Sequence, residues 1–67
     1  MMEWTPQARQ IFEEYCMQNR QQVLAQGADP DEVRADLQAF IEQELRDQGL
    51  SDAGQDDVKR ILMRLGN

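Results

Sequence analysis

The sequence contains no histidine and a single cysteine, Cys16. One thiol cannot form a disulfide within the chain, and without histidine there is no complete ligand set for a structural zinc ion. Cys16 also lacks a histidine that would activate it as a nucleophile. We therefore expect no disulfide, no metal, no cofactor and no catalytic activity. A lone cysteine is in keeping with a reducing compartment.

Basic residues are few, since seven Lys and Arg stand against thirteen Asp and Glu and the net charge is −6. Nucleic acids and anionic membrane surfaces attract clustered positive charge, so we expect neither as a partner. No apolar run approaches the roughly 18 residues that span a bilayer, and residues 1–9 lack the pattern of a signal peptide. The sequence thus predicts a soluble, cytoplasmic chain with no membrane insertion by this segment.

What the sequence does contain is three amphipathic segments separated by turn signals. Thr5 and Pro6 form a helix start, and Gly27 and Gly49 are expected to end the first two helices. We predict helices over residues 6–26, 30–48 and 56–65, with Ser51 as an alternative start of the third and residues 51–55 otherwise a loop. The apolar stripes that define them are Ala8, Ile11, Phe12, Tyr15 and Val23; Val33, Leu37, Phe40 and Ile41, with Leu45 at the margin; and Val58, Ile61, Leu62 and Leu65.

The fold expected from these stripes is all-α. Their widths are compatible and the connections between them are short, which predicts a compact three-helix domain with antiparallel neighbours. The 67 residues are enough for one domain, near the lower limit for unaided folding. We expect a single helical domain over residues 1–67.

Three acids lie close together at Asp29, Asp31 and Glu32, directly before the second predicted helix. The segment lacks the ligand spacing of a calcium-binding EF-hand loop, and residues 52–57 lack it too. A helix start explains the cluster better, with Asp29 as N-cap, Pro30 in the first helical position and Glu32 completing a variant of the capping box. We interpret these acids as a helix cap and not as a metal or catalytic site.

The excess negative charge is concentrated in residues 29–48, where seven acids stand against two arginines. One interpretation is a solvated helix face with acids placed favourably at the helix start. The other is an acidic docking surface for a basic partner segment, with Asp36, Glu42 and Asp47 as exposed partner-binding residues. Complementary charge of that kind acts mainly on the association rate. Glu44 falls near the apolar stripe, and we expect it to pair with an arginine or reach solvent.

A few apolar residues do not fit the predicted core. Met17 and Leu24 are seven residues apart on the side of the first helix opposite its stripe, and Met63 faces away from the stripe of the third. They are candidate partner-binding residues for a protein or for a second copy in a homodimer. The alternative is that the first helix is covered more fully than its stripe implies. Trp4 is expected to fold back over the core, the alternative being a ligand-stacking side chain.

Three stretches together give the chain a resemblance to HAAS-type helical domains: WTPQA at residues 4–8, GADPDEVRADLQAFIEQEL at 27–45 and DDVKRILMRLG at 56–66. These are small modules associated with bacterial signalling and membrane proteins. The resemblance implies an interaction or regulatory module, usually the N-terminal part of a longer protein whose next segment enters the membrane, and it implies no catalytic residues. This sequence departs from it at Gly54, where a Ser or Thr cap is more common. No membrane segment follows Gly66, so we expect an excised domain or a free-standing relative.

These observations favour a non-catalytic protein-interaction or regulatory module, with self-association as one form. The alternative is a helix-turn-helix-like nucleic-acid-binding domain, because the turn at residues 27–29 has a suitable length. Against this alternative, the third helix offers only Lys59, Arg60 and Arg64 to the phosphate backbone.

Overall fold

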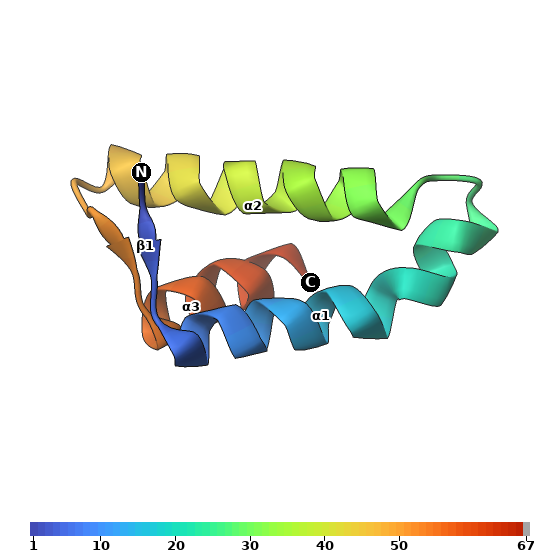
Figure 1. Ribbon diagram of the computed structural model, residues 1–67, viewed down its shortest axis with the longest axis horizontal. Helices are drawn as coiled ribbons and strands as arrows, with labels where there is room; N and C mark the ends of the chain where they lie inside the picture. The colour runs from blue at the N-terminus through green and yellow to red at the C-terminus, as the bar shows by residue number, and fades with distance from the viewer. Residues whose placement is uncertain (67) are drawn as a thin grey trace.

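A computed structural model describes residues 1–66, which form three helices and two very short strands (Figure 1). The helices are α1 (Pro6–Ala25), α2 (Pro30–Asp47) and α3 (Gln55–Leu65). The strands are β1 (Glu3–Trp4) and β2 (Asp52–Ala53). The prediction of an all-α, three-helix fold is therefore confirmed, and each predicted helix end lies within one residue of the observed end.

The first two helices begin at the caps that the sequence predicts. Oγ1 of Thr5 accepts a hydrogen bond from the backbone N–H of Ala8 at 3.1 Å. Oδ1 of Asp29 accepts one from the backbone N–H of Asp31 at 3.0 Å, with Pro30 in the first helical position. Each side chain satisfies a donor that has no partner within its helix. Asp29 is thus a helix cap.

The same two helices end at glycines in the left-handed region. Gly27 has φ of 80° and Gly49 has φ of 81°, a conformation that costs glycine little because it has no Cβ. After Gly49, the backbone N–H of Leu50 donates to the carbonyl of Leu45 at 2.9 Å, closing the last turn of α2. Leu50 then packs half-buried against the core. These glycines allow the short turns that reverse the chain.

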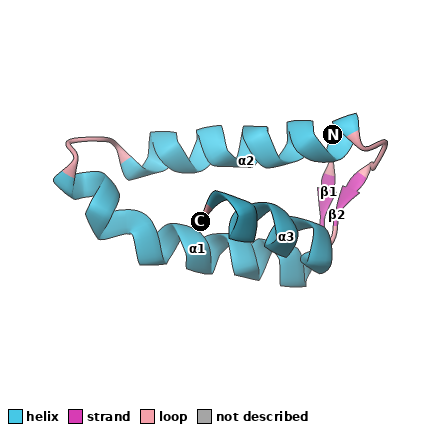
Figure 2. Ribbon diagram, turned by 180° about the vertical axis from the view of Figure 1, so that it is seen from behind, coloured by secondary structure: helices cyan, strands magenta, loops and turns pink. Residues whose placement is uncertain are grey.

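The strands correct the prediction of an open loop at residues 51–55. β1 and β2 pair in parallel, with Glu3 opposite Asp52 and Trp4 opposite Ala53. The backbone N–H of Thr5 extends the pairing by donating to the carbonyl of Ala53 at 3.1 Å. Because the two strands are parallel and each leads into a helix, α1 and α3 leave this end of the molecule in the same general direction (Figure 2).

α2 runs back antiparallel to α1 and lies alongside it (Figure 1). A helix-turn-helix joins its two helices at about 90–120°, so the α1–α2 pair differs from that motif. None of the helices within residues 1–66 is long and apolar enough to cross a membrane.

The core lies where all three helices and the strand pair meet. Its largest fully buried side chains come from each helix: Phe12, Ile41, Leu45, Val58 and Ile61. Trp4 packs on this cluster, with its ring centroid 5.3 Å from that of Phe12. The expectation that Trp4 folds back over the core is confirmed.

Three assignments within the apolar stripe of α2 are wrong. Leu45, expected at the margin, is fully buried, whereas Phe40 and Val33, expected in the core, are 40% and 39% exposed. Leu65 at the end of α3 is exposed as well. The reason is the length of α3, whose 11 residues cover only one end of the longer α1–α2 pair (Figure 1). The part of α2 that extends past the end of α3 has no third helix against its apolar side chains.

Candidate functional site

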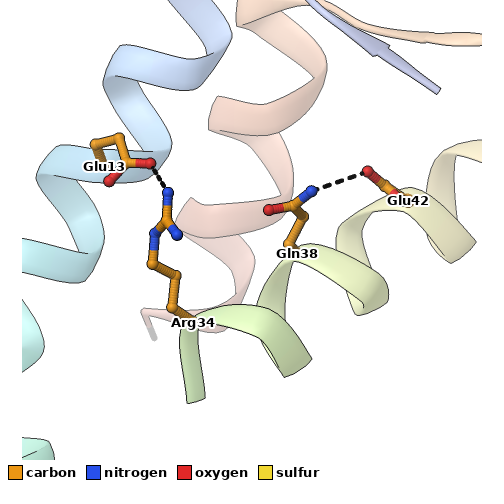
Figure 3. Close-up of polar contacts among 4 residues, drawn as sticks. All are labelled: Glu13, Arg34, Gln38 and Glu42. Atoms are coloured by element: carbon orange, nitrogen blue, oxygen red, sulfur yellow. Dashed lines mark hydrogen bonds and ion pairs between the residues drawn. The ribbon is translucent and has the colours of Figure 1, made fainter. Parts of the chain in front are cut away.

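A surface depression of about 460 Å³ lies between α1 and the first turns of α2. Its lining mixes charged, polar and apolar residues: Glu13, Cys16, Met17, Arg20, Pro30, Asp31 and Arg34. Glu13 of α1 and Arg34 of α2 form an ion pair that joins the two helices here (Figure 3).

Arg34 is committed to this contact between helices. The hydrogen bond from its guanidinium to Glu13 raises the pKa of Arg34 above its ordinary value. The guanidinium also lies 5.7 Å from the ring centroid of Phe12, within cation–π distance. Its Nε is buried and finds no hydrogen-bond partner within residues 1–66. The charged guanidinium of Arg34 therefore holds α2 against α1.

Cys16 is half-buried in the same depression. Burial raises the pKa of the Cys16 thiol above its ordinary value, although nearby Arg34 acts in the opposite direction. A raised pKa keeps the thiol protonated at neutral pH, where only the thiolate is an effective nucleophile or metal ligand. Across the described part of the chain, no group of three or more Cys, Asp or Glu side chains is placed to hold a metal ion.

A second groove, of about 290 Å³, runs between α1 and α3. Its lining includes four apolar or aromatic residues and charged residues from both helices: Ile11, Glu14, Tyr15, Gln18, Lys59, Leu62 and Met63. Met63 is thus at the border with α1, although its side chain is largely exposed.

A third surface, which we call the α2 face, consists of Val33, Leu37 and Phe40 with the acids Asp36 and Asp47. The apolar residues follow the i, i+4, i+7 spacing of one helix face. Asp36 lies one turn from Phe40, and Asp47 lies two turns beyond it on the same side. Both acids are exposed. The face therefore combines an incompletely covered apolar line with a parallel line of negative charge.

The α2 face has defined neighbours. Val33 and Leu37 also line a narrow cleft of about 40 Å³ whose other wall includes Tyr15 and Val23 of α1. Four residues beyond Phe40, Glu44 accepts a hydrogen bond from Arg64 of α3 at 3.3 Å. The expectation that Glu44 pairs with an arginine is confirmed. This ion pair connects the α2 face to the end of α3.

Glu42 does not share this surface, and its predicted exposed position is wrong. It is half-buried and accepts hydrogen bonds from Trp4 Nε1 at 2.8 Å and from Gln38 Nε2 at 3.3 Å. Figure 3 shows the contact with Gln38. Six residues separate Asp36 from Glu42, which places the two on different sides of α2. Glu42 therefore anchors Trp4, while Asp36 and Asp47 remain together on the α2 face.

The three apolar candidates outside α2 do not form one patch. Met17 and Leu24 are exposed on α1, and Met17 lines the depression beside Arg34. Met63 borders the groove between α1 and α3. The sequence also gave no candidate role to Phe40 and Val33, because their spacing placed them in the core. The exposure of these two residues could have been predicted from the short third helix, which is about half the length of the other two.

Comparisons with family models, with curated proteins and with solved structures find no match to this chain.

Proposed function

We propose that this chain is a non-catalytic protein-interaction or regulatory module. The observation that carries the proposal is the exposure of Val33 and Phe40, which have core spacing on α2 but no third helix against them. Covering apolar surface is favourable by roughly 25 cal/mol per Å². Apolar side chains grouped on a helix face and bordered by charge are typical of protein-binding surfaces.

The absence of catalysis is part of the proposal, and the chemistry of the depression supports it. Its cysteine has a raised pKa, and the sequence provides no histidine to act as a base. Glu13 and Arg34 are engaged with each other. A nucleophile and a positioned base are the minimum for acyl transfer and related reactions, and the described residues of the depression offer neither.

The protein-interaction role is tested by comparing three forms of the chain as bait in native lysate: wild type, Phe40→Ser and Ala39→Ser. Ala39 is exposed on the same helix, so its replacement controls for the introduction of a serine into this part of α2. We expect wild type and Ala39→Ser to retain a common protein that Phe40→Ser loses. Equal retention by all three forms, or no retention by any of them, would contradict the proposed function.

Self-association is one form that this function takes, with Met17 and Leu24 as the residues in contact. Both are exposed on α1 and seven residues apart, so they lie on one line of the helix. Sedimentation velocity at increasing concentration should then show a dimer that Leu24→Asp abolishes. A monomer at every concentration would leave only interaction with other proteins.

We also propose that the chain is a relative of HAAS-type helical domains and acts as a regulatory part of a bacterial signalling or membrane protein. The order of its three helices, with their caps and apolar stripes, supports this relationship. The neighbouring coding sequence in the intact gene product provides the test. A membrane-spanning helix or a kinase domain after residue 67 would support the proposal, and an unrelated enzyme would contradict it.

A further inference from the structure

We propose that the α2 face binds a basic amphipathic helix of a partner protein. This inference rests on the proposed function and specifies the chemistry of the partner. Three properties of the face lead to it: the spacing of its apolar residues, the lack of ionic partners for its acids within residues 1–66, and the repulsion that the face would produce against the same face of a second copy.

The apolar residues form a line that suits a helix. Val33, Leu37 and Phe40 extend over about 10 Å along α2, which is roughly two turns. A docking helix uses anchors at the same i, i+3, i+4 and i+7 spacing. Because α3 ends at Leu65, α1 and α2 extend past its end (Figure 1), and Val33 and Phe40 remain partly exposed.

The acids beside this line lack ionic partners. Among residues 1–66 the ion pairs are Glu13 with Arg34, Asp57 with Arg60 and Glu44 with Arg64. None of them uses Asp36 or Asp47, and within residues 1–66 the one side-chain hydrogen bond to these two carboxylates comes from the neutral Gln43 to Asp47. The arginines of α2 are placed elsewhere, since Arg34 binds Glu13 and Arg46 lines a pocket with Met2 and Leu50.

Asp36 and Asp47 are separated by about 16 Å along the helix axis. A partner helix with Lys or Arg beside its apolar stripe, at a similar spacing, would neutralise both carboxylates while its apolar residues cover Phe40. Charged groups beside an apolar contact raise the association rate and fix the orientation of the partner. The geometry thus selects a partner that is apolar on one side and basic on the adjoining side.

A second copy of this chain fits the same face poorly. A two-fold dimer places the same patch of both subunits in contact, which would bring the acids of one copy close to the acids of the other. Nucleic acids and anionic membranes are excluded as occupants by the same sign of charge.

The test uses two synthetic amphipathic peptides with identical leucine positions, one with Lys and the other with Glu on the polar side. Each is titrated into the full ¹⁵N-labelled chain at low and high salt, and amide shifts and peptide anisotropy are recorded. We expect only the Lys peptide to bind, with the largest shifts around Val33, Leu37 and Phe40. Higher salt should weaken this binding.

Matched variants separate specific docking from general attraction of a basic peptide to an acidic protein. Asp36→Lys and Glu3→Lys change the net charge equally, and Glu3 is exposed on β1 at a different site. We expect Asp36→Lys to weaken binding of the Lys peptide about tenfold relative to Glu3→Lys. Phe40→Ser should weaken it relative to Ala39→Ser. Circular dichroism verifies that each variant is folded.

Equal weakening by Asp36→Lys and Glu3→Lys would overturn the inference, as would equal binding of both peptides or no binding of the Lys peptide. The proposed function would survive these outcomes if Phe40→Ser still lost the protein retained by wild-type bait. If the peptide test failed and Phe40→Ser also retained the protein that wild-type bait retains, the proposed function would be contradicted as well.

Discussion

The indole Nε1 of Trp4 donates a hydrogen bond to Oε2 of Glu42 at 2.8 Å, joining residues that are 38 positions apart. The Trp4 ring packs against Phe12, and the guanidinium of Arg9 lies 5.6 Å from its centroid. Trp4 thereby connects β1 with both α1 and α2. The contact also explains why the carboxylate of Glu42 is half-buried, unlike those of Asp36 and Asp47 on the same helix.

Glu42→Ala should lower the free energy of unfolding by about 1 kcal/mol, because it removes the acceptor of the Trp4 indole. Glu42→Gln should lower it less, since the amide oxygen can still accept that hydrogen bond. Urea unfolding followed through the fluorescence of Trp4, the one tryptophan in the sequence, measures both. Equal losses in the two variants would show that the indole hydrogen bond contributes little.

Leu45→Ala should destabilise the chain far more than Phe40→Ala. Leu45 is fully buried, and truncating a buried leucine costs about 2–5 kcal/mol. This is comparable to the roughly 3–5 kcal/mol that a core of this size supplies, so Leu45→Ala should be largely unfolded by circular dichroism. Phe40→Ala removes a partly exposed ring, and we expect a folded protein. A folded Leu45→Ala beside an unfolded Phe40→Ala would contradict the observed core.

The helices and their ends could be predicted because local interactions determine them. Thr5 and Asp29 accept hydrogen bonds from residues two or three positions away, and the left-handed turns after α1 and α2 require a residue such as Gly27. The strand pair could not be predicted, since two-residue segments carry no periodicity and their pairing joins distant parts of the chain.

The candidate site was predicted less completely than the fold. The spacing of Phe40 and Leu45 places both near the apolar side of α2, but it does not say which part of α2 lies against α3. Charge counting found the acids of α2, yet it could not separate Asp36 from Glu42, whose partner Trp4 is remote in sequence. Each error arose where a contact between elements distant in sequence, and not a local contact, determines the position of a side chain.

Gly54→Ser should raise the free energy of unfolding by about 0.5–1 kcal/mol. Gly54 is the N-cap of α3 with no side-chain hydrogen bond, and its φ of −88° suits any residue. A Cβ there would meet Oδ2 of Asp57 at 3.4 Å, an ordinary contact. Ser adds a capping hydroxyl and restricts the unfolded chain.

Gly49→Ser is the contrasting change in the same thermal or urea measurements. Because Gly49 has φ of 81°, a side chain at that position should lower stability by roughly 1 kcal/mol. The same sign of effect at Gly54 and Gly49 would be inconsistent with these backbone conformations.

Cys16 should make the stability of the chain fall at alkaline pH. Burial raises the pKa of its thiol above the ordinary value of 9.0, with Arg34 lowering it and Glu13 raising it to smaller extents. Below the pKa that the thiol has in the unfolded chain, the thiol is protonated in both the folded and the unfolded state, and the free energy of unfolding has its full value. As pH rises past that value, the unfolded chain releases its proton first, so the free energy of unfolding falls until pH passes the folded pKa.

Cys16→Ala removes this dependence while leaving the other titrating groups in place. The free energy of unfolding of the wild type should therefore fall relative to that of Cys16→Ala as pH rises from about 8 to about 10. Urea titrations at matched ionic strength measure this difference. At neutral pH, a disulfide reagent should modify Cys16 more slowly in the folded chain than in urea, because less of the buried thiol is ionised. Parallel pH profiles for the two proteins would mean that the folded chain does not favour the protonated thiol.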